Sequence, residues 1–339
     1  MKTIKIIQLV ISLAVIVALI VIMVLFISGK VNFSTFFKTE KQIVLLDQKE
    51  SLQDISSVKF DLNSINVIIT PSDDDQMSIT YRGPESLKDK LDLTVRVDNG
   101  TLIIQQSKNF AIQFFNWNFT PKVLEITLPE SYAKDLTIGN SSGNISVSGN
   151  YNLSDFSGKL TSGNFRIEDL TCNDFQIHNS SGNVTLGTIS SKTLGISLVS
   201  GNLKADAITG DGKIRVSSGN LTAGTLIGKT TLDVISGNIT VYSFEGSGSA
   251  SCASGNINIS VSKASGDLSA ATTSGNVEIG MTADVAYQID AHCTSGDIRS
   301  DFAMIYSSGN KSATGSYGTS PTYKLTLKTV SGNIALVEK

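Results

Sequence analysis

The chain has 339 residues, of which 40% are hydrophobic and 17% charged. This length allows two or three domains, and the regular spacing of the apolar residues excludes an intrinsically disordered chain. Beyond Lys30 there are 24 basic and 30 acidic residues, a net charge of −6, which argues against nucleic acid or anionic lipid as the partner.

An apolar run opens the chain. It extends from Ile6 to Ile27 with only Gln8 and Ser12 as polar members, and at ~1.5 Å per residue it would span about 33 Å, enough for a bilayer core. A cleaved signal peptide is the competing interpretation, but its apolar core would be shorter and would end in a small-residue cleavage site. We expect an uncleaved transmembrane anchor over residues 6–28. The lysines at its start predict a cytoplasmic stub over residues 1–5.

A linker and a β-rich segment are expected next. Residues 29–50 would join the membrane to the folded part, and residues 51–130 would form an N-terminal β cap that covers the open end of a following stack. The sequence Asp98-Asn99-Gly100 lies between two alternating runs and predicts a hairpin. Alternation of apolar and polar residues predicts strands at Val58–Leu62, Val67–Thr70, Met77–Tyr81, Leu93–Val97, Thr101–Gln106 and Val123–Leu128.

The expected cap also contains an aromatic cluster with the only tryptophan of the chain. If these rings are exposed they would form a contact patch; if they are buried they would plug the end of the stack. Both readings stay open for the residues Phe110, Phe114, Phe115, Trp117 and Phe119.

A three-residue phrase, Ser-Gly-Asn or Ser-Gly-Asp, recurs after residue 136. Its glycines are 18–21 residues apart, except for a last step of 36 residues. Such a period indicates one supersecondary unit stacked on copies of itself. We expect the long last step to contain a loop over residues 302–321. The recurring glycines are Gly143, Gly163, Gly182, Gly201, Gly219, Gly237, Gly255, Gly275, Gly296 and Gly332.

Apolar residues flank each glycine with a period of two. The residue two positions after it is always apolar, and the residue five positions before it is apolar except at Gly158. This periodicity predicts short strands on both sides of a corner at which glycine supplies the backbone freedom. A phosphate-binding glycine loop would instead need a helix after the glycine. The expected fold is therefore all-β, with a single-stranded parallel β-solenoid over residues 131–339 and ladders of stacked Asn side chains.

Cysteine and histidine offer no chemistry in this arrangement. His178 and His292 share a column six coils apart, too far to share a metal ion. Cys252 and Cys293 share a column two coils apart, about 10 Å, which exceeds the ~7 Å limit for a disulfide. We expect these two cysteines and Cys172 to be free thiols. No catalytic motif, cofactor site or metal site is expected.

The order of these parts resembles a bacterial family of domains of unknown function that are often labelled adhesins. With its N-terminal anchor the chain is also similar to the LiaG-like proteins of Gram-positive bacteria. The resemblance covers about residues 55–339, implies the solenoid fold and a link to envelope-stress operons, and brings no catalytic residues. It rests on the segments Ile65–Pro71 and Leu124–Pro129, the Ser-Gly-Asn coils, Gly315–Gly318 and Leu325–Ile334.

Together these features favour a non-enzymatic protein of the cell membrane. Its C-terminal part would project out of the cytoplasm and contact cell-wall glycan or another envelope protein. One alternative is an accessory regulator of a membrane sensor. Another is a glycan-active enzyme, which would need acidic residues gathered on adjacent coils. The outward positions four before the glycines are not such a cluster, since they read Lys159, His178, Ser197, Arg215, Asp233, Ser251 and Ala271.

Overall fold

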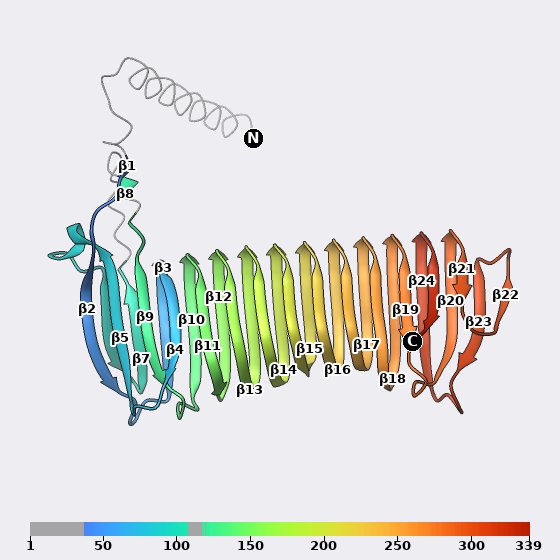
Figure 1. Ribbon diagram of the computed structural model, residues 1–339, viewed down its shortest axis with the longest axis horizontal. Coiled ribbons are helices and arrows are strands. Elements are labelled where there is room, and N and C mark those ends of the chain that lie inside the picture. The colour runs from blue at the N-terminus through green and yellow to red at the C-terminus, as the bar shows by residue number, and fades with distance from the viewer. Residues whose placement is uncertain (1–36, 108–116, 119) are drawn as a thin grey trace, which may run out of the picture.

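The computed structural model describes residues 37–107, 117–118 and 120–339, which form an elongated all-β rod (Figure 1). Long strands stack in parallel along most of its length, as the sequence predicts. Their bounds are β10 (Asp135–Ser142), β11 (Ile145–Asn152), β12 (Asp155–Ser162), β13 (Phe165–Ser181), β14 (Val184–Ser200), β15 (Leu203–Ser218), β16 (Leu221–Ser236), β17 (Ile239–Ser254) and β18 (Ile257–Ser274).

Each coil has three straight stretches separated by corners. Within β13 the alternation of buried and unburied residues is interrupted by two adjacent unburied residues at 168–169 and again at 173–174. Strand β13 pairs with β14 in parallel, with Phe165 opposite Val184 and Ser181 opposite Ser200. The inward side chains therefore stack in columns and form one continuous apolar core. Gly158 lacks a side chain because the Phe165 ring occupies the space where its Cβ would lie.

The stack begins earlier than the expected boundary at residue 131. Strands β3 (Ser57–Ser64) and β4 (Asn66–Ser72) pair in parallel with β10 and β11. Ile65 takes the corner of this first coil, and Asn66 Oδ1 accepts a hydrogen bond from the Asn144 backbone N–H at 2.8 Å. Because an isoleucine replaces the glycine, the repeated phrase does not mark this coil.

Shorter strands cover the N-terminal end, and every strand predicted there is present. The strands are β2 (Gln42–Ser51), β5 (Gln76–Pro84), β6 (Leu93–Asp98), β7 (Thr101–Gln106) and β9 (Val123–Pro129), with a short 3-10 helix at Glu85–Leu87. Asn99 and Gly100 have φ values of 49° and 74° between β6 and β7, which form the predicted antiparallel hairpin. Strand β7 pairs with β3 and β9 pairs with β4, so the cap continues the stack.

The linker expected over residues 29–50 is wrong from residue 42 onward. Strand β2 pairs antiparallel with β5 along its whole length. Leu45 and Leu46 pack against the core, which accounts for the regular strand structure of this segment.

Strand β1 (Phe37–Lys38) pairs in parallel with β8 (Trp117–Asn118). The anchor expected over residues 6–28 lies outside the described residues, and no helix within the described ranges is long and apolar enough to cross a membrane.

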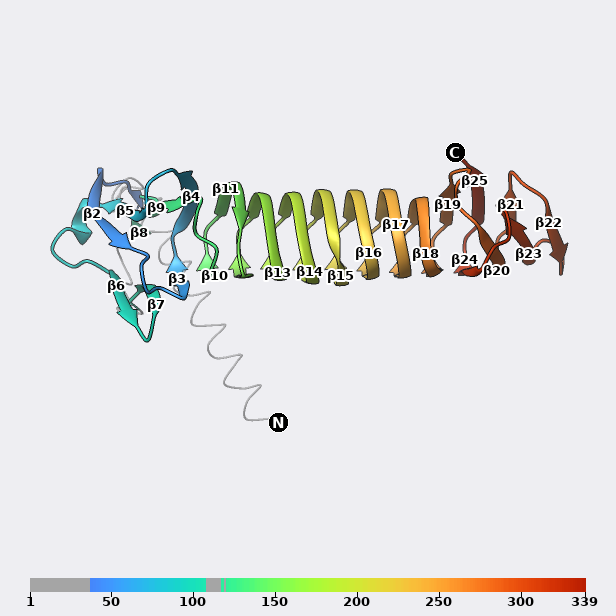
Figure 2. The same cartoon turned by 90° about the horizontal axis from the view of Figure 1, so that it is seen from below.

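The C-terminal coils do not stack in sequence order. Strand β24 (Tyr323–Ser331) lies between β18 and β20 (Tyr287–Ser295), pairing in parallel with both (Figures 1 and 2). On the adjoining side β25 (Ile334–Glu338) lies between β19 (Val277–Met281) and β21 (Ile298–Ser300). The last coil of the chain is therefore inserted before the coil that precedes it, and the assumption of sequential stacking was wrong.

The loop expected over residues 302–321 is largely a hairpin. Strands β22 (Met304–Ser307) and β23 (Ser312–Tyr317) pair antiparallel, and β23 also pairs antiparallel with β20. A parallel stack ends in a row of unpaired backbone groups, which is a hazard for edge-to-edge association. The hairpin covers that edge and closes the rod.

Candidate functional site

The ten repeated glycines form one column along an edge of the rod. Each has a φ between +116° and +150°, a region that favours glycine. A Cβ at any of them would lie less than 3.0 Å from the carbonyl oxygen of the corner residue in the neighbouring coil. Backbone conformation and stacking together account for the glycines without a bound ligand.

The Asn side chains after these glycines form an exposed ladder. Asn202 Oδ1 accepts hydrogen bonds from the backbone N–H of Asn220 at 2.9 Å and from its Nδ2 at 3.3 Å. The same pair of bonds joins Asn238 to Asn220. These contacts satisfy backbone groups that leave the regular pairing at the corner.

Aspartates serve the other two corners in the same way. Asp169 Oδ1 accepts from the Thr188 backbone N–H at 3.0 Å, and Asp211 Oδ1 accepts from the Lys229 backbone N–H at 2.7 Å. Several acidic residues that look scattered in the sequence are therefore corner acceptors. Asp155, Asp174 and Asp211 share one corner column at coil spacing, which is the signal that would have revealed them.

The inward column three before the glycines mixes apolar residues with small polar ones. Cys252 Sγ and Thr272 Oγ1 donate to the carbonyls of Gly237 and Gly255, at 3.1 and 3.0 Å. Cys252, Cys293 and Cys172 are all free and buried, as predicted. Burial raises the pKa of all three thiols, that of Cys172 to about 12.

The inserted coil changes the expected separations in these columns. Cys252 lies opposite Thr272, Thr272 opposite Thr329, and Thr329 opposite Cys293. The two cysteines are thus three spacings apart, about 14 Å rather than 10 Å. The two histidines are likewise seven spacings apart rather than six.

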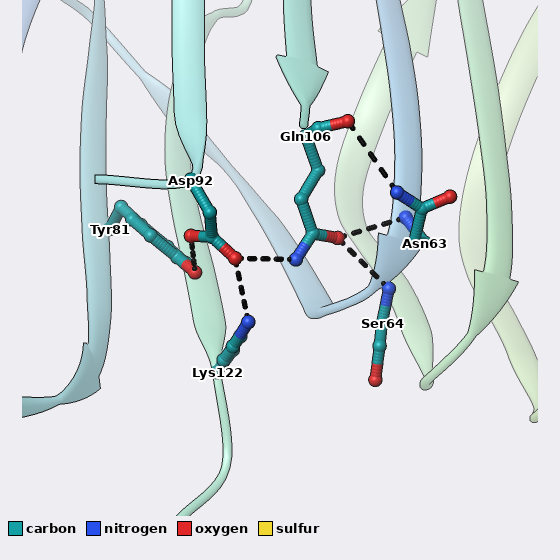
Figure 3. Close-up of polar contacts among 6 residues, drawn as sticks. All are labelled: Asn63, Ser64, Tyr81, Asp92, Gln106 and Lys122. Carbon is teal, nitrogen blue, oxygen red and sulfur yellow. Dashed lines mark hydrogen bonds and ion pairs between the residues drawn. The ribbon is translucent and has the colours of Figure 1, made fainter. Parts of the chain in front are cut away.

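A buried polar network joins the cap to the first coil (Figure 3). Asp92 accepts hydrogen bonds from Tyr81 Oη at 2.7 Å and Gln106 Nε2 at 2.9 Å, and pairs with Lys122 Nζ at 2.6 Å. Gln106 Oε1 in turn accepts from the backbone N–H groups of residues 63 and 64. Burial favours the neutral carboxyl, but the hydrogen bonds, led by that from Lys122, outweigh it and lower the pKa of Asp92. The network is structural, since its members bond to one another.

One side of the rod carries two grooves, and we call it the groove face. It consists of the outward positions six and four before nine successive corner glycines. In spatial order these are Ser157, Lys159, Gln176, His178, Gly195, Ser197, Lys213, Arg215, Thr231, Asp233, Ser249, Ser251, Ser269, Ala271, Thr326, Lys328, Asp290 and His292.

The basic groove lies toward the cap and has a volume of about 510 Å³. Its charged lining residues are Lys159, Lys213 and Arg215, and no acidic residue lines it. The floor is low because Gly195 has no side chain, and the Gln176 amide lies across that space. The full lining is Ser157, Gly158, Lys159, Gln176, Ile177, His178, Gly195, Ile196, Ser197, Lys213 and Arg215.

The second groove, of about 560 Å³, continues the face toward the C-terminal hairpin. Asp233 lies at the boundary, paired with Lys213 Nζ at 2.5 Å and accepting from Ser251 Oγ at 2.7 Å. Partial burial raises the pKa of Asp233, but the Lys213 and Ser251 hydrogen bonds and the Arg215 charge outweigh it and hold the pKa below its ordinary value. Small residues line most of this groove, with the exposed side chains of Ile235 and Val330 beside them.

A third groove, of about 410 Å³, lies on another side of the coils and has mixed charge. It is lined by Arg166 and Lys204 together with Glu168, Asp169 and Asp206. Glu168 accepts from the Gly149 backbone N–H at 3.1 Å, so this carboxylate, like that of Asp169, is engaged at a corner. Across the described ranges no group of three His, Cys, Asp or Glu residues could hold a metal ion.

The profile of the family described as Toastrack DUF4097 matches residues 55–226 and 222–337, most of the chain. The chain belongs to this family. The resemblance to the adhesin-labelled family of domains is thus confirmed. No curated protein matches this Toastrack chain.

Solved structures similar to the Toastrack chain include proteins named as bacterial adhesins. A "putative adhesin" from Bacteroides fragilis is 15% identical with a TM-score of 0.36, covering 89% of this chain and 99% of that one. One from Parabacteroides merdae is 11% identical with a TM-score of 0.37 and the same coverage. A "putative lipid binding protein" from Parabacteroides distasonis is 18% identical with a TM-score of 0.40, covering 89% and 98%.

The aromatic patch expected in the Toastrack chain lies mostly outside the described residues. This applies to Phe110, Phe114, Phe115 and Phe119, whereas Trp117 belongs to β8. The groove face was missed as a site because its charged residues come from different coils, and Lys159 and Arg215 are 56 positions apart in sequence. Only the register of the coils brings Lys159 and Arg215 into one groove.

Proposed function

We propose that this Toastrack protein is a non-enzymatic, membrane-held module of the cell envelope whose groove face binds an envelope glycan or an envelope protein. The groove face is the observation that carries this proposal. It presents outward side chains in two straight columns over nine coils, with two grooves along them.

The construction of the rod suits this role. The Ser-Gly-Asn corners are fixed by backbone pairing, by a glycine and by the Asn ladder, so the outward columns keep their spacing. A preordered surface loses little conformational entropy when it binds, which leaves more of the contact energy for affinity. An extended row of equivalent positions also matches a partner that is itself extended.

The place of the module is part of the same proposal. The apolar run over residues 6–28 supports an anchor, and the lysines before it support a cytoplasmic N-terminus with the rod on the other side of the membrane. We further propose a role in the envelope-stress response, on the strength of the resemblance to LiaG-like proteins. Because the expected stub is only five residues long, such a role would act through another membrane protein.

In-cell photo-crosslinking tests whether the groove face is the binding surface. A photoreactive amino acid would be placed at Ser197 or Ser251 on the groove face, and at Thr222 or Thr240 on another side of the rod. We expect adducts with envelope material from the two groove-face positions and none from the two controls. Equal adducts from all four positions, or none from any, would contradict the proposal.

A further inference from the structure

The basic groove stands apart from the rest of this acidic chain. Its lining holds three basic side chains and no carboxylate, while the chain beyond Lys30 has a net charge of −6. Lys213 is already paired with Asp233. Lys159 and Arg215, by contrast, have no carboxylate within ion-pair distance among the residues that the structure describes, and both side chains are exposed. Two cations that belong to no ion pair therefore face one open groove, and Asp233, in the coil next to Arg215, is paired with Lys213 instead.

The register sets the distance between these cations. Lys159 lies opposite His178, His178 opposite Ser197, and Ser197 opposite Arg215. Three coil spacings separate the two charges, about 14 Å along the rod. The space between them is lined by small or hydrogen-bonding side chains, with Gly195 at its floor. A single small anion cannot bridge two charges this far apart, whereas an extended chain lying along the groove can.

We propose that the basic groove binds a linear polyanion, an envelope polymer that carries a phosphate or carboxylate group in its repeating unit. This inference rests on the proposed function, because it gives the partner chemistry of the same face. Arg215 supplies a planar fork that matches either anion, and Lys159 supplies a point charge. Nucleic acid is disfavoured because the lining contains no Phe, Tyr or Trp ring, and His178 is its only ring on which a base could stack.

The test uses full-length protein in detergent and fluorescently labelled polyphosphate, with binding followed by anisotropy. Polygalacturonate serves as the carboxylate polymer, neutral dextran and inorganic phosphate as the uncharged and single-anion controls, and a mixed-sequence single-stranded oligonucleotide as the nucleic-acid control. We expect one of the two polyanions to bind, more tightly as the chain lengthens, with affinity falling as salt rises. Whichever polymer binds shows whether phosphate or carboxylate is the preferred group.

Two matched double variants locate the site. Lys159→Gln with Arg215→Gln removes the unpaired cations of the basic groove, and should weaken polyanion binding roughly fivefold to thirtyfold and flatten its salt dependence. Arg166→Gln with Lys204→Gln removes the same charge from the mixed-charge groove and should leave binding unchanged. The far-ultraviolet circular dichroism of both variants should match that of the parent protein, since all four side chains are exposed.

Several results would overturn the inference. These are no binding of either polyanion, equal losses in the two double variants, inorganic phosphate binding as tightly as the polymer, or an oligonucleotide binding more tightly than both polyanions. Adducts from Ser197 in cells together with no polyanion binding would reject this inference and leave the groove face as a binding surface for another partner. Polyanion binding without adducts would reject the proposed function instead.

Discussion

Replacing a corner glycine tests the structural reading of the Ser-Gly-Asn repeat most sharply. At Gly219 φ is +134°, and an added Cβ would lie less than 3.0 Å from the carbonyl oxygen of Gly201. In Gly219→Ala the backbone strain costs about 1–3 kcal/mol. Displacing the corner also weakens the hydrogen bond from the Gly219 backbone N–H to the Ser236 carbonyl and those of the Asn ladder, each worth about 0.5–1.5 kcal/mol. We expect a total of about 2–4 kcal/mol.

Hydrogen exchange read by mass spectrometry suits this variant because the coils interact mainly with their neighbours. The peptides that contain the corners at Gly201, Gly219 and Gly237 should exchange roughly 30- to 1,000-fold faster than in the parent protein. Peptides several coils away should change little.

Gly139→Ala is the matched control. Its φ is not in the left-handed region, and the nearest atom to an added Cβ is the Phe60 carbonyl oxygen at 3.4 Å, an ordinary contact. This change should be neutral or stabilising by about 0.4–1 kcal/mol, because alanine restricts the unfolded chain. Equal amide exchange rates in the two variants would refute the structural explanation of the corner glycines. Ligand binding would then be the better explanation of why the glycines recur.

Three further predictions follow from other parts of the molecule. Asp92→Asn should cost about 1–3 kcal/mol, seen as faster exchange at the amides of residues 63 and 64, while Asp98→Asn in the exposed pair with Arg96 should cost less than about 0.5 kcal/mol. Because the pKa of Asp92 is lowered, its contribution is present at neutral pH and should be lost as the pH falls below the ordinary carboxyl value of 3.8, whereas flat protection into stronger acid would contradict the ion pair. The buried thiols of Cys172, Cys252 and Cys293 should react with iodoacetamide at neutral pH only on unfolding, and rapid labelling of the native protein would show that their burial is wrong. Full-length protein should remain in the membrane fraction after a carbonate wash, and a secreted form that begins near Lys30 would show that the apolar run is a signal peptide.

The sequence predicts the solenoid well because its physical cause is local. A corner with a left-handed φ needs a glycine, and each strand needs an inward residue at every second position, so the phrase and the flanking apolar residues repeat with the coil. The same stacking argument predicts that the three cysteines are free thiols. That prediction is confirmed, although the expected separation of Cys252 and Cys293 was wrong.

The order of the last coils could not be read from the sequence. Each coil presents nearly the same stacking surface, so the residues around Gly332 fit beside those of Gly275 as well as the residues around Gly296 do. Only the strand pairing in the structure shows that the coil of Gly332 lies between the coils of Gly275 and Gly296. The first coil was hidden for a different reason, since Ile65 occupies its corner.

The candidate site was beyond the sequence for a related reason. Side chains from four coils form the basic groove, and no local pattern joins Lys159 to Arg215. The Asp92 network likewise joins positions 81, 92, 106 and 122, which share no period. The apolar core repeats in every coil, so the sequence reveals it. Which polar side chains meet one another depends on how the coils are stacked, and the sequence does not show that.

Lysine footprinting would test the groove face most directly. Full-length protein would be acetylated with and without an isolated envelope fraction, and the modification of each lysine quantified by mass spectrometry. We predict that Lys159, Lys213 and Lys328 on the groove face become less reactive when the envelope fraction is present, while Lys204 and Lys229 on other sides of the coils keep their reactivity. Equal protection of all five lysines, or protection of Lys204 and Lys229 alone, would contradict the assignment of the groove face as the binding surface.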